Sequence, residues 1–144
     1  QQSEIKSLSQ IKIDLHDTMM EYRRKYWAGR AIAAPQINIK KRIIYMNIDR
    51  PILFINPVLK DLSDEMIEIW DDCMCFPDLL VRVRRHRYCK IEYRDESWEL
   101  QTMNLADDLS ELLQHEYDHL DGTLAVSRAI NGKAFSLKTQ RHLL

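Results

Sequence analysis

The sequence is poor in cysteine, glycine and proline: three, three and four residues in a chain of 144. The cysteines are odd in number and two of them, Cys73 and Cys75, are nearly adjacent, so they do not form a disulfide framework, and a reducing compartment is expected. No apolar run approaches the roughly 18 residues of a membrane helix, and the first ten residues lack the basic and apolar regions of a signal peptide. We therefore expect a protein of the cytoplasm, or of an organellar matrix in a eukaryote, without a membrane partner.

Charge of either sign is not in excess, because the formal net charge is -1. This balance argues against a protein whose main task is to neutralise nucleic-acid phosphates, and no direct nucleic-acid binding is expected. Apolar residues make up 45% and charged residues 30% of the chain, as in ordinary globular proteins. The length predicts a single domain over residues 1–144, which we expect to be a monomer.

Hydrophobic spacing divides the chain into a helix, a block of strands and a second helix. Apolar residues at steps of three and four predict a helix from residue 8 to residue 26, and the same spacing returns at 106–120. Between them, short β-rich runs are separated by turn-forming residues, which is typical of antiparallel sheet. The predicted fold class is α+β. The β-rich runs are "RIIYMNI", "ILFINPVL", "MIEIW", "LLVRV", "YCKIEYR" and "WELQTMNL".

The stretch "QHEYDH" places two histidines four residues apart, with a glutamate directly after the first. On a helix, residues i and i+4 share one face, so His115 and His119 can bind one metal ion while Glu116 stands beside it. The third ligand decides the class of enzyme. No glutamate follows Glu116, which excludes the thermolysin-like arrangement, and Ala125 stands where a metzincin would have its last histidine. The third ligand must come from upstream, where "DDCMCFPDL" offers two thiols.

Three motifs in this order resemble the peptide deformylase family, as a divergent member. They read "GRAIAAPQ" (29–36), "DDCMC" (71–75) and "QHEYDH" (114–119), and the resemblance extends from about residue 8 to residue 130. It implies antiparallel β-sheets packed around a central helix that carries the HExxH motif. It also implies a metal-dependent hydrolase that removes the formyl group from the amino-terminal formylmethionine of peptides, on nascent chains at the ribosome. The enzyme would cleave a carbon–nitrogen bond of a formamide, not a peptide bond.

The same resemblance assigns the metal ligands. They would be Cys73, His115 and His119, with Cys75 as the rival thiol that aligns with a serine of the family. One thiolate and two imidazoles leave a position open for water, as a catalytic site requires. The cofactor would be one divalent metal ion, Fe²⁺ in most members of the family, with Zn²⁺, Ni²⁺ or Co²⁺ able to occupy the same ligands. Glu116 would be the general base and acid.

Other site residues also follow from the resemblance. The side-chain amide of Gln36 and the backbone N–H of Met74 would stabilise the negative oxygen that forms during hydrolysis. Gly29 and Ala31 would allow close approach of the substrate. Asp72 lies beside the metal ligand Cys73, where it could perturb the metal water, bind a basic group of the substrate or point to solvent.

Two glycines of the family's motifs are replaced in this chain, by Ala31 and Asp72, and Asp71 and Cys75 stand in place of a glutamate and a serine. On the helix, Glu111 and Asp108 could bring charge to a methionine pocket, or form an exposed acidic edge. Three hypotheses stay open: a peptide deformylase, a hydrolase of another small N-formyl amide, and a homologue that binds metal or formyl peptides with little turnover. A further expectation is that "VRVRRHR" (81–87) forms a solvated edge strand.

Overall fold

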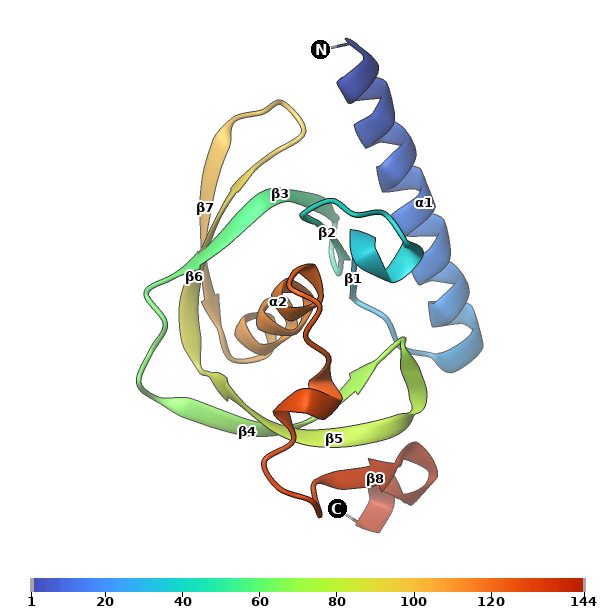
Figure 1. The fold of residues 1–144 in the computed structure, drawn as a ribbon, viewed down its shortest axis with the longest axis vertical. Coiled ribbons are helices and arrows are strands. Elements are labelled where there is room, and N and C mark those ends of the chain that lie inside the picture. Colours follow the sequence, from blue (N-terminus) through green and yellow to red (C-terminus); the bar gives the residue numbers. More distant parts are fainter. Residues whose placement is uncertain (1, 144) are drawn as a thin grey trace.

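The computed structural model describes residues 2–143 and has two long helices and eight strands. A five-stranded antiparallel sheet has the order β1-β2-β3-β6-β7, and a three-stranded one has the order β4-β5-β8. Helix α2 lies between the sheets, and α1 packs on the outside (Figure 1). The bounds are α1 (Gln2–Tyr26), β1 (Ala31–Ala33), η1 (Ala34–Ile37), β2 (Ile43–Asn47), β3 (Pro51–Lys60), β4 (Met66–Cys73), β5 (Phe76–His86), β6 (Tyr88–Arg94), β7 (Leu100–Ala106), α2 (Asp107–Leu120), η2 (Ala125–Arg128), β8 (Phe135–Leu137) and η3 (Lys138–Leu143).

Strands β1 and β2 and residues 53–55 of β3 are buried on both faces of the five-stranded sheet, which explains the continuous apolar runs there, whereas β6 and β7 alternate with exposed residues. Ile44 of β2 belongs to the core cluster that contains Leu113 of α2. Its neighbour Tyr45 faces the other way, into the cluster that contains Leu15 and Met19 of α1. Because side chains alternate along a strand, one face of the sheet packs on α2 and the other face packs on α1. The apolar stripe predicted for the first helix is confirmed as the surface that packs on this sheet.

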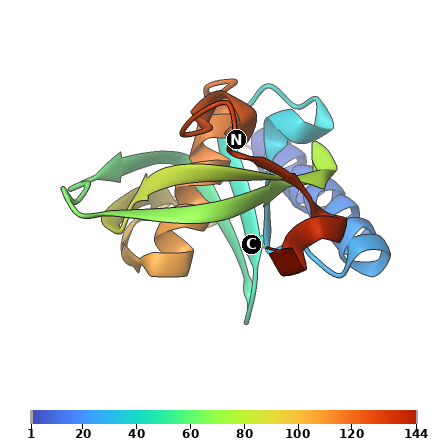
Figure 2. The ribbon, with the colours of Figure 1, turned by 90° about the horizontal axis from the view of Figure 1, so that it is seen from below.

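Helix α2 is buried along most of its length although much of its sequence is polar. Its apolar side chains, such as Leu112 and Leu113, pack on the five-stranded sheet, and its polar residues face the three-stranded sheet. A polar helix is stable in such a place only when its polar groups have partners. The predicted α+β class and the central position of the HExxH helix are both confirmed (Figures 1 and 2).

Two features of the sheets differ from the expectations. Residues 81–86 lie in β5, which is the middle strand between β4 and β8, so the predicted edge strand is wrong. Strands β1 and β8 have three residues each and gave no pattern long enough to predict.

Among the helices of residues 2–143, none combines the length and the apolar character that crossing a membrane requires.

Candidate metal centre and adjoining cavity

Cys73, His115 and His119 converge in the interior of the protein. Cys73 ends β4, immediately before the turn to β5, and the two histidines lie one turn apart on α2. The Cys73 Sγ and His119 Nε2 atoms are 3.2 Å apart, as are the Nε2 atoms of His119 and His115. All three candidate ligand atoms lie within 4.8 Å of one another. Ligands around a tetrahedral ion would be separated by about 3.3–3.6 Å, so the group fits a divalent metal ion.

Asp71 fixes the orientation of the first imidazole. His115 Nδ1 donates to Asp71 Oδ2 at 2.7 Å, which leaves Nε2 directed toward the other two ligands. Burial raises the pKa of Asp71, but the hydrogen bond to His115 and the charge of Arg85 outweigh burial and hold the pKa below its usual value. A carboxylate behind a ligand histidine is the usual outer support of a metal site, because it fixes the tautomer and makes the imidazole more basic.

The other imidazole has the opposite electrostatic environment. Burial and the neighbouring His115 lower the pKa of His119 to about 4. For His115 itself burial lowers the pKa, but the hydrogen bond with Asp71 outweighs it and raises the value to about 9. A metal ligand must be a neutral imidazole, so a cation at this place would displace the proton that His115 holds at neutral pH in its absence.

Glu116 stands beside the three ligand atoms without joining them. Its Oε1 atom is 3.8 Å from His115 Nε2, and its buried Oε2 atom has no hydrogen-bond partner among the described residues, 2–143. Burial raises the pKa of Glu116 to about 7. A buried carboxylate with an unsatisfied oxygen and a pKa near neutrality is suited to accept and return a proton.

The side-chain amide of Gln36 points at the same place. The backbone N–H of Ala33 donates to Gln36 Oε1 at 2.8 Å, which fixes the orientation of the amide. Its Nε2 atom then faces the sulfurs of Cys73 and Cys75, at 3.9 and 3.7 Å. Met74 occupies the first position of the two-residue turn between β4 and β5. The structure thus brings Gln36 and the Met74 backbone next to Cys73.

A cavity of about 340 Å³ adjoins this group, with Cys73, His115 and Glu116 in its lining. Gly29, Ala31 and Asp72 also line it. Gly29 has a φ of 121°, and a Cβ atom there would approach the Tyr22 ring to 3.2 Å, so this position requires glycine. The three residues predicted to bind substrate, Gly29, Ala31 and Asp72, therefore border the same cavity, as does Met74, whereas among residues 2–143 Gln36 is not part of its lining.

Ala31 and Asp72, which replace glycines of the family motifs, are accommodated without backbone strain. Among residues 2–143, neither Ala31 nor Asp72 has a positive φ. The Asp72 side chain is partly exposed and accepts a hydrogen bond from Lys138 Nζ at 3.1 Å. Asp72 therefore neither contacts the ligand atoms nor points freely to solvent. The exposed-edge interpretation is correct for Asp108 and wrong for Glu111, which is buried and paired with Arg30.

Several supporting residues were not predicted. Arg85 is buried and donates to Asp71 and to Asp118, at 3.0 and 2.8 Å. Gln114 pairs its amide with the backbone N–H and C=O of His86, at 3.0 and 2.7 Å, and so joins α2 to β5. The sequence held one signal for Arg85, because it is in phase with the inward-facing Val81 and Val83 of the same strand.

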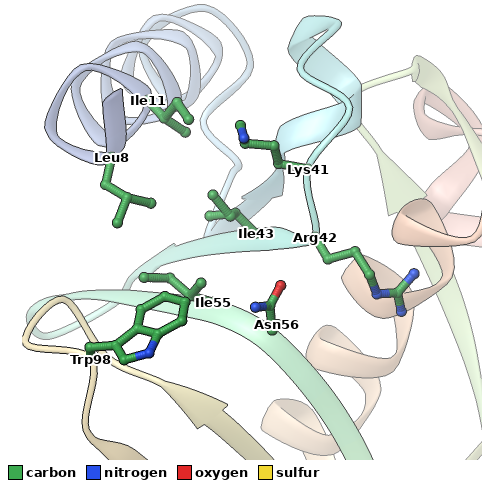
Figure 3. A pocket seen from close by; sticks show the side chains of 8 residues that line it. All are labelled: Leu8, Ile11, Lys41, Arg42, Ile43, Ile55, Asn56 and Trp98. Carbon is green, nitrogen blue, oxygen red and sulfur yellow. The ribbon is translucent and has the colours of Figure 1, made fainter. Parts of the chain in front are cut away.

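A second cavity, of about 370 Å³, lies between α1, β2 and β3 and contains none of the predicted site residues (Figure 3). Trp98 and Ile55 border it, and Arg42 at its rim is tied to Asp121 at the end of α2 by a 2.8 Å contact. Within the part of the chain that the structure describes, no histidine, cysteine or carboxylate lines it. Of these two cavities, the one beside Cys73 therefore carries the chemical groups.

Comparisons with known proteins agree with the motifs. A family model described as polypeptide deformylase matches residues 1–135. A peptide deformylase of Microchaete diplosiphon is 33% identical over 109 residues, which cover 72% of this chain and 58% of that protein. One of Orientia tsutsugamushi is 30% identical over 142 residues, covering 88% and 76%. The solved Plasmodium falciparum peptide deformylase, in complex with an inhibitor, has a TM-score of 0.79 and 31% identity over 88% of this chain and 76% of its own. The chain spans about three fifths of the length of the first of these relatives.

Proposed function

Because the chain belongs to the polypeptide deformylase family, we propose that it hydrolyses the formyl group from the amino-terminal formylmethionine of peptides. The products are formate and a free amine. The observation that carries the proposal is the convergence of Cys73, His115 and His119, with Glu116 beside them and a cavity in front. The substrate is a formamide, so the bond that breaks is a carbon–nitrogen bond outside the peptide backbone.

The residues divide the reaction between them. Cys73, His115 and His119 would hold a divalent cation, which when bound would lower the pKa of a water molecule to about 7 and supply positive charge for the formyl oxygen. Glu116 takes the proton of the water and passes it to the nitrogen that leaves. Its raised pKa allows it to hold the proton between the two steps and then release it.

Gln36 and Met74 are proposed to stabilise the oxygen of the formyl group as it gains negative charge. The Gln36 amide is already oriented by its hydrogen bond from Ala33, with its N–H₂ group directed toward Cys73. The Met74 backbone N–H lies in the turn directly after Cys73. A single donor of this kind typically contributes a factor of about 10² to 10³ in rate.

The remaining parts of the proposal concern the metal and the setting. We propose Fe²⁺ as the metal, since it is the ion most members of the family use, although a mixed sulfur and nitrogen set also fits Zn²⁺, Ni²⁺ or Co²⁺. Residues 1–144 would act as one domain, because both sheets pack on α2, and we propose that the protein acts as a monomer. The substrates would be nascent chains at the ribosome, in the cytoplasm or an organellar matrix.

The test is an anaerobic assay of formate release by iron-loaded and zinc-loaded protein, on formyl-Met-Ala-Ser and on formylated short amines. Glu116→Gln is expected to lower kcat by a factor of about 10² to 10⁴, while Glu99→Gln, in the turn between β6 and β7, serves as the control and is expected to keep full activity. Turnover of the amines alone would select a hydrolase of another N-formyl amide. A loaded protein without turnover on either substrate would select a binding homologue.

A further inference from the structure

The cavity beside Cys73 has a polar wall, which affects the side chains that a substrate can place there. This inference rests on the proposed function. In a formyl peptide, the first side chain begins three bonds from the formyl carbon, within about 4 Å of it. With the formyl group at the metal ligands, that side chain must enter the cavity that Cys73, His115 and Glu116 line. Arg30 is part of the same wall.

Arg30 is held in this wall by a buried partner. Its Nη2 atom donates to Glu111 Oε1 at 2.9 Å, and the side chains of Arg30 and Glu111 are 44% and 10% exposed. Glu111 lies one helical turn before His115, on the same face of α2. Among residues 2–143, Glu111 is the one hydrogen-bond partner of the Arg30 side chain. The rest of the guanidinium therefore keeps N–H groups that an incoming side chain can use.

The acidic groups around the cavity are already engaged. Asp71 accepts from His115 and Arg85, and Asp72 accepts from Lys138. Glu116 is reserved for the proton transfers. Arg141 also lines the cavity, so apart from Glu116 the wall offers a substrate side chain mainly N–H donors, from Arg30 beside the metal ligands' helix and from Arg141.

We propose that Arg30, positioned by Glu111, makes this cavity accept a first side chain that ends in a carbonyl oxygen, so that the enzyme discriminates weakly between methionine and a polar residue of similar length. Glutamine is the matched probe, because its side chain has nearly the length of methionine and carries one carboxamide. In an apolar pocket this amide would lose its hydrogen bonds to water without replacement. Beside Arg30 its oxygen receives an N–H in exchange.

The experiment compares kcat/KM for formyl-Met-Ala-Ser and formyl-Gln-Ala-Ser. For the unmodified protein we expect the two values to differ by less than about tenfold. In Arg30→Met/Glu111→Leu, which replaces the pair by apolar side chains, the ratio of methionine to glutamine should rise by about 10- to 100-fold. The matched control Lys60→Met/Glu92→Leu removes an ion pair of the same 2.9 Å separation between β3 and β6, and should leave the ratio unchanged.

A binding measurement separates specificity from chemistry. Calorimetry with metal-loaded Glu116→Gln protein gives the dissociation constants of formyl-Met-Ala-Ser and formyl-Gln-Ala-Ser. Adding Arg30→Met/Glu111→Leu should change their ratio as much as it changes the ratio of the kcat/KM values. If thermal unfolding shows that the double variant does not fold, the single variant Arg30→Met tests the same donor, and there the ratio should again rise.

The outcomes distinguish this inference from the function on which it rests. Turnover of formyl-Met-Ala-Ser with a methionine preference above about 100-fold, unaltered by the double variant, would overturn the role of Arg30 and leave the deformylase proposal standing. Absence of turnover on both peptides would overturn both.

Discussion

Asp71 and Asp72 are neighbours in the chain, yet their carboxylates are in different environments. Asp71 is buried and accepts hydrogen bonds from His115 and from Arg85. Asp72 points away from the ligand atoms and pairs with Lys138 near the surface. Adjacent side chains of a strand face opposite ways, so substitutions of these two aspartates compare a buried acid with a partly exposed one at neighbouring positions.

Replacing Asp71 by Asn is expected to weaken metal binding by about 10- to 100-fold, because the His115 imidazole loses the charged acceptor that makes it basic and fixes its tautomer. The measurement is competition for Zn²⁺ against a chelator of known affinity. Asp72→Asn is the control and should bind the metal as the unmodified protein does. An equal loss in both variants would mean that charge near the site, and not the hydrogen bond to His115, determines the affinity.

Strand β5 carries two adjacent arginines that face opposite ways, and one of them joins the two halves of the site. Arg85 faces inward and links Asp71 of β4 to Asp118 of α2, while the adjacent Arg84 is exposed and pairs with Glu68 at 2.8 Å. Removing one member of a buried charge cluster leaves the others without compensation. The same strand thus carries one arginine on which the packing of α2 depends and one on the surface.

We expect Arg85→Met to lower the free energy of unfolding by about 3–5 kcal/mol, since Asp71 and Asp118 would lose a shared buried partner. Arg84→Met, the neighbouring substitution on the exposed face, should change it by less than about 1 kcal/mol. Urea denaturation followed by circular dichroism measures both. Similar small losses in the two variants would show that water or rearranged side chains replace Arg85.

How much of the fold could be predicted depended on the length and regularity of each element. The two helices and the strands β2 to β7 were predicted because their apolar residues repeat with a clear period. Strands β1 and β8 have three residues each and are defined by their partners β2 and β5, so local sequence contains little information about them. For β5, the arginines pointed to a solvated edge, but pairing with β8 and the charges of Asp71 and Asp118 determine the outcome.

The site was more predictable than its surroundings. His115, Glu116 and His119 are fixed relative to one another by a single helix, and a spacing within one helix can be read from the sequence. The thiol had to come from upstream, and the resemblance to a family selected Cys73. The support by Asp71 and the pairing of Glu111 with Arg30 depend on how β4 and the segment before β1 meet α2. Those are tertiary contacts, which spacing does not contain.

The candidate metal ligands connect parts of the chain that are far apart in sequence, and this gives the cation a role in the stability of the entire protein. Cys73 lies at the end of β4 in the three-stranded sheet, and its sulfur is close to His119 of α2. In the sequence, 42 positions separate Cys73 from His115. A cation that binds only the folded protein stabilises it by about 2.7 kcal/mol when its free concentration is 100 times the dissociation constant. Unfolding of the metal-loaded protein must therefore also break the contacts between the cation and its three ligands.

The last prediction is that metal loading raises Tm by roughly 10 °C for a chain of this length, and that chelation reverses the shift. Cys73→Ser should abolish most of the shift, because a hydroxyl is a poor ligand for a borderline-soft ion. Cys75→Ser changes the rival thiol in the same turn and should retain the shift, since Cys75 is exposed and lies outside the converging group. Scanning calorimetry with and without chelator gives all three values. Loss of the shift in Cys75→Ser and its retention in Cys73→Ser would contradict the ligand assignment and make Cys75, whose sulfur lies 3.7 Å from the Gln36 Nε2 atom, the third ligand.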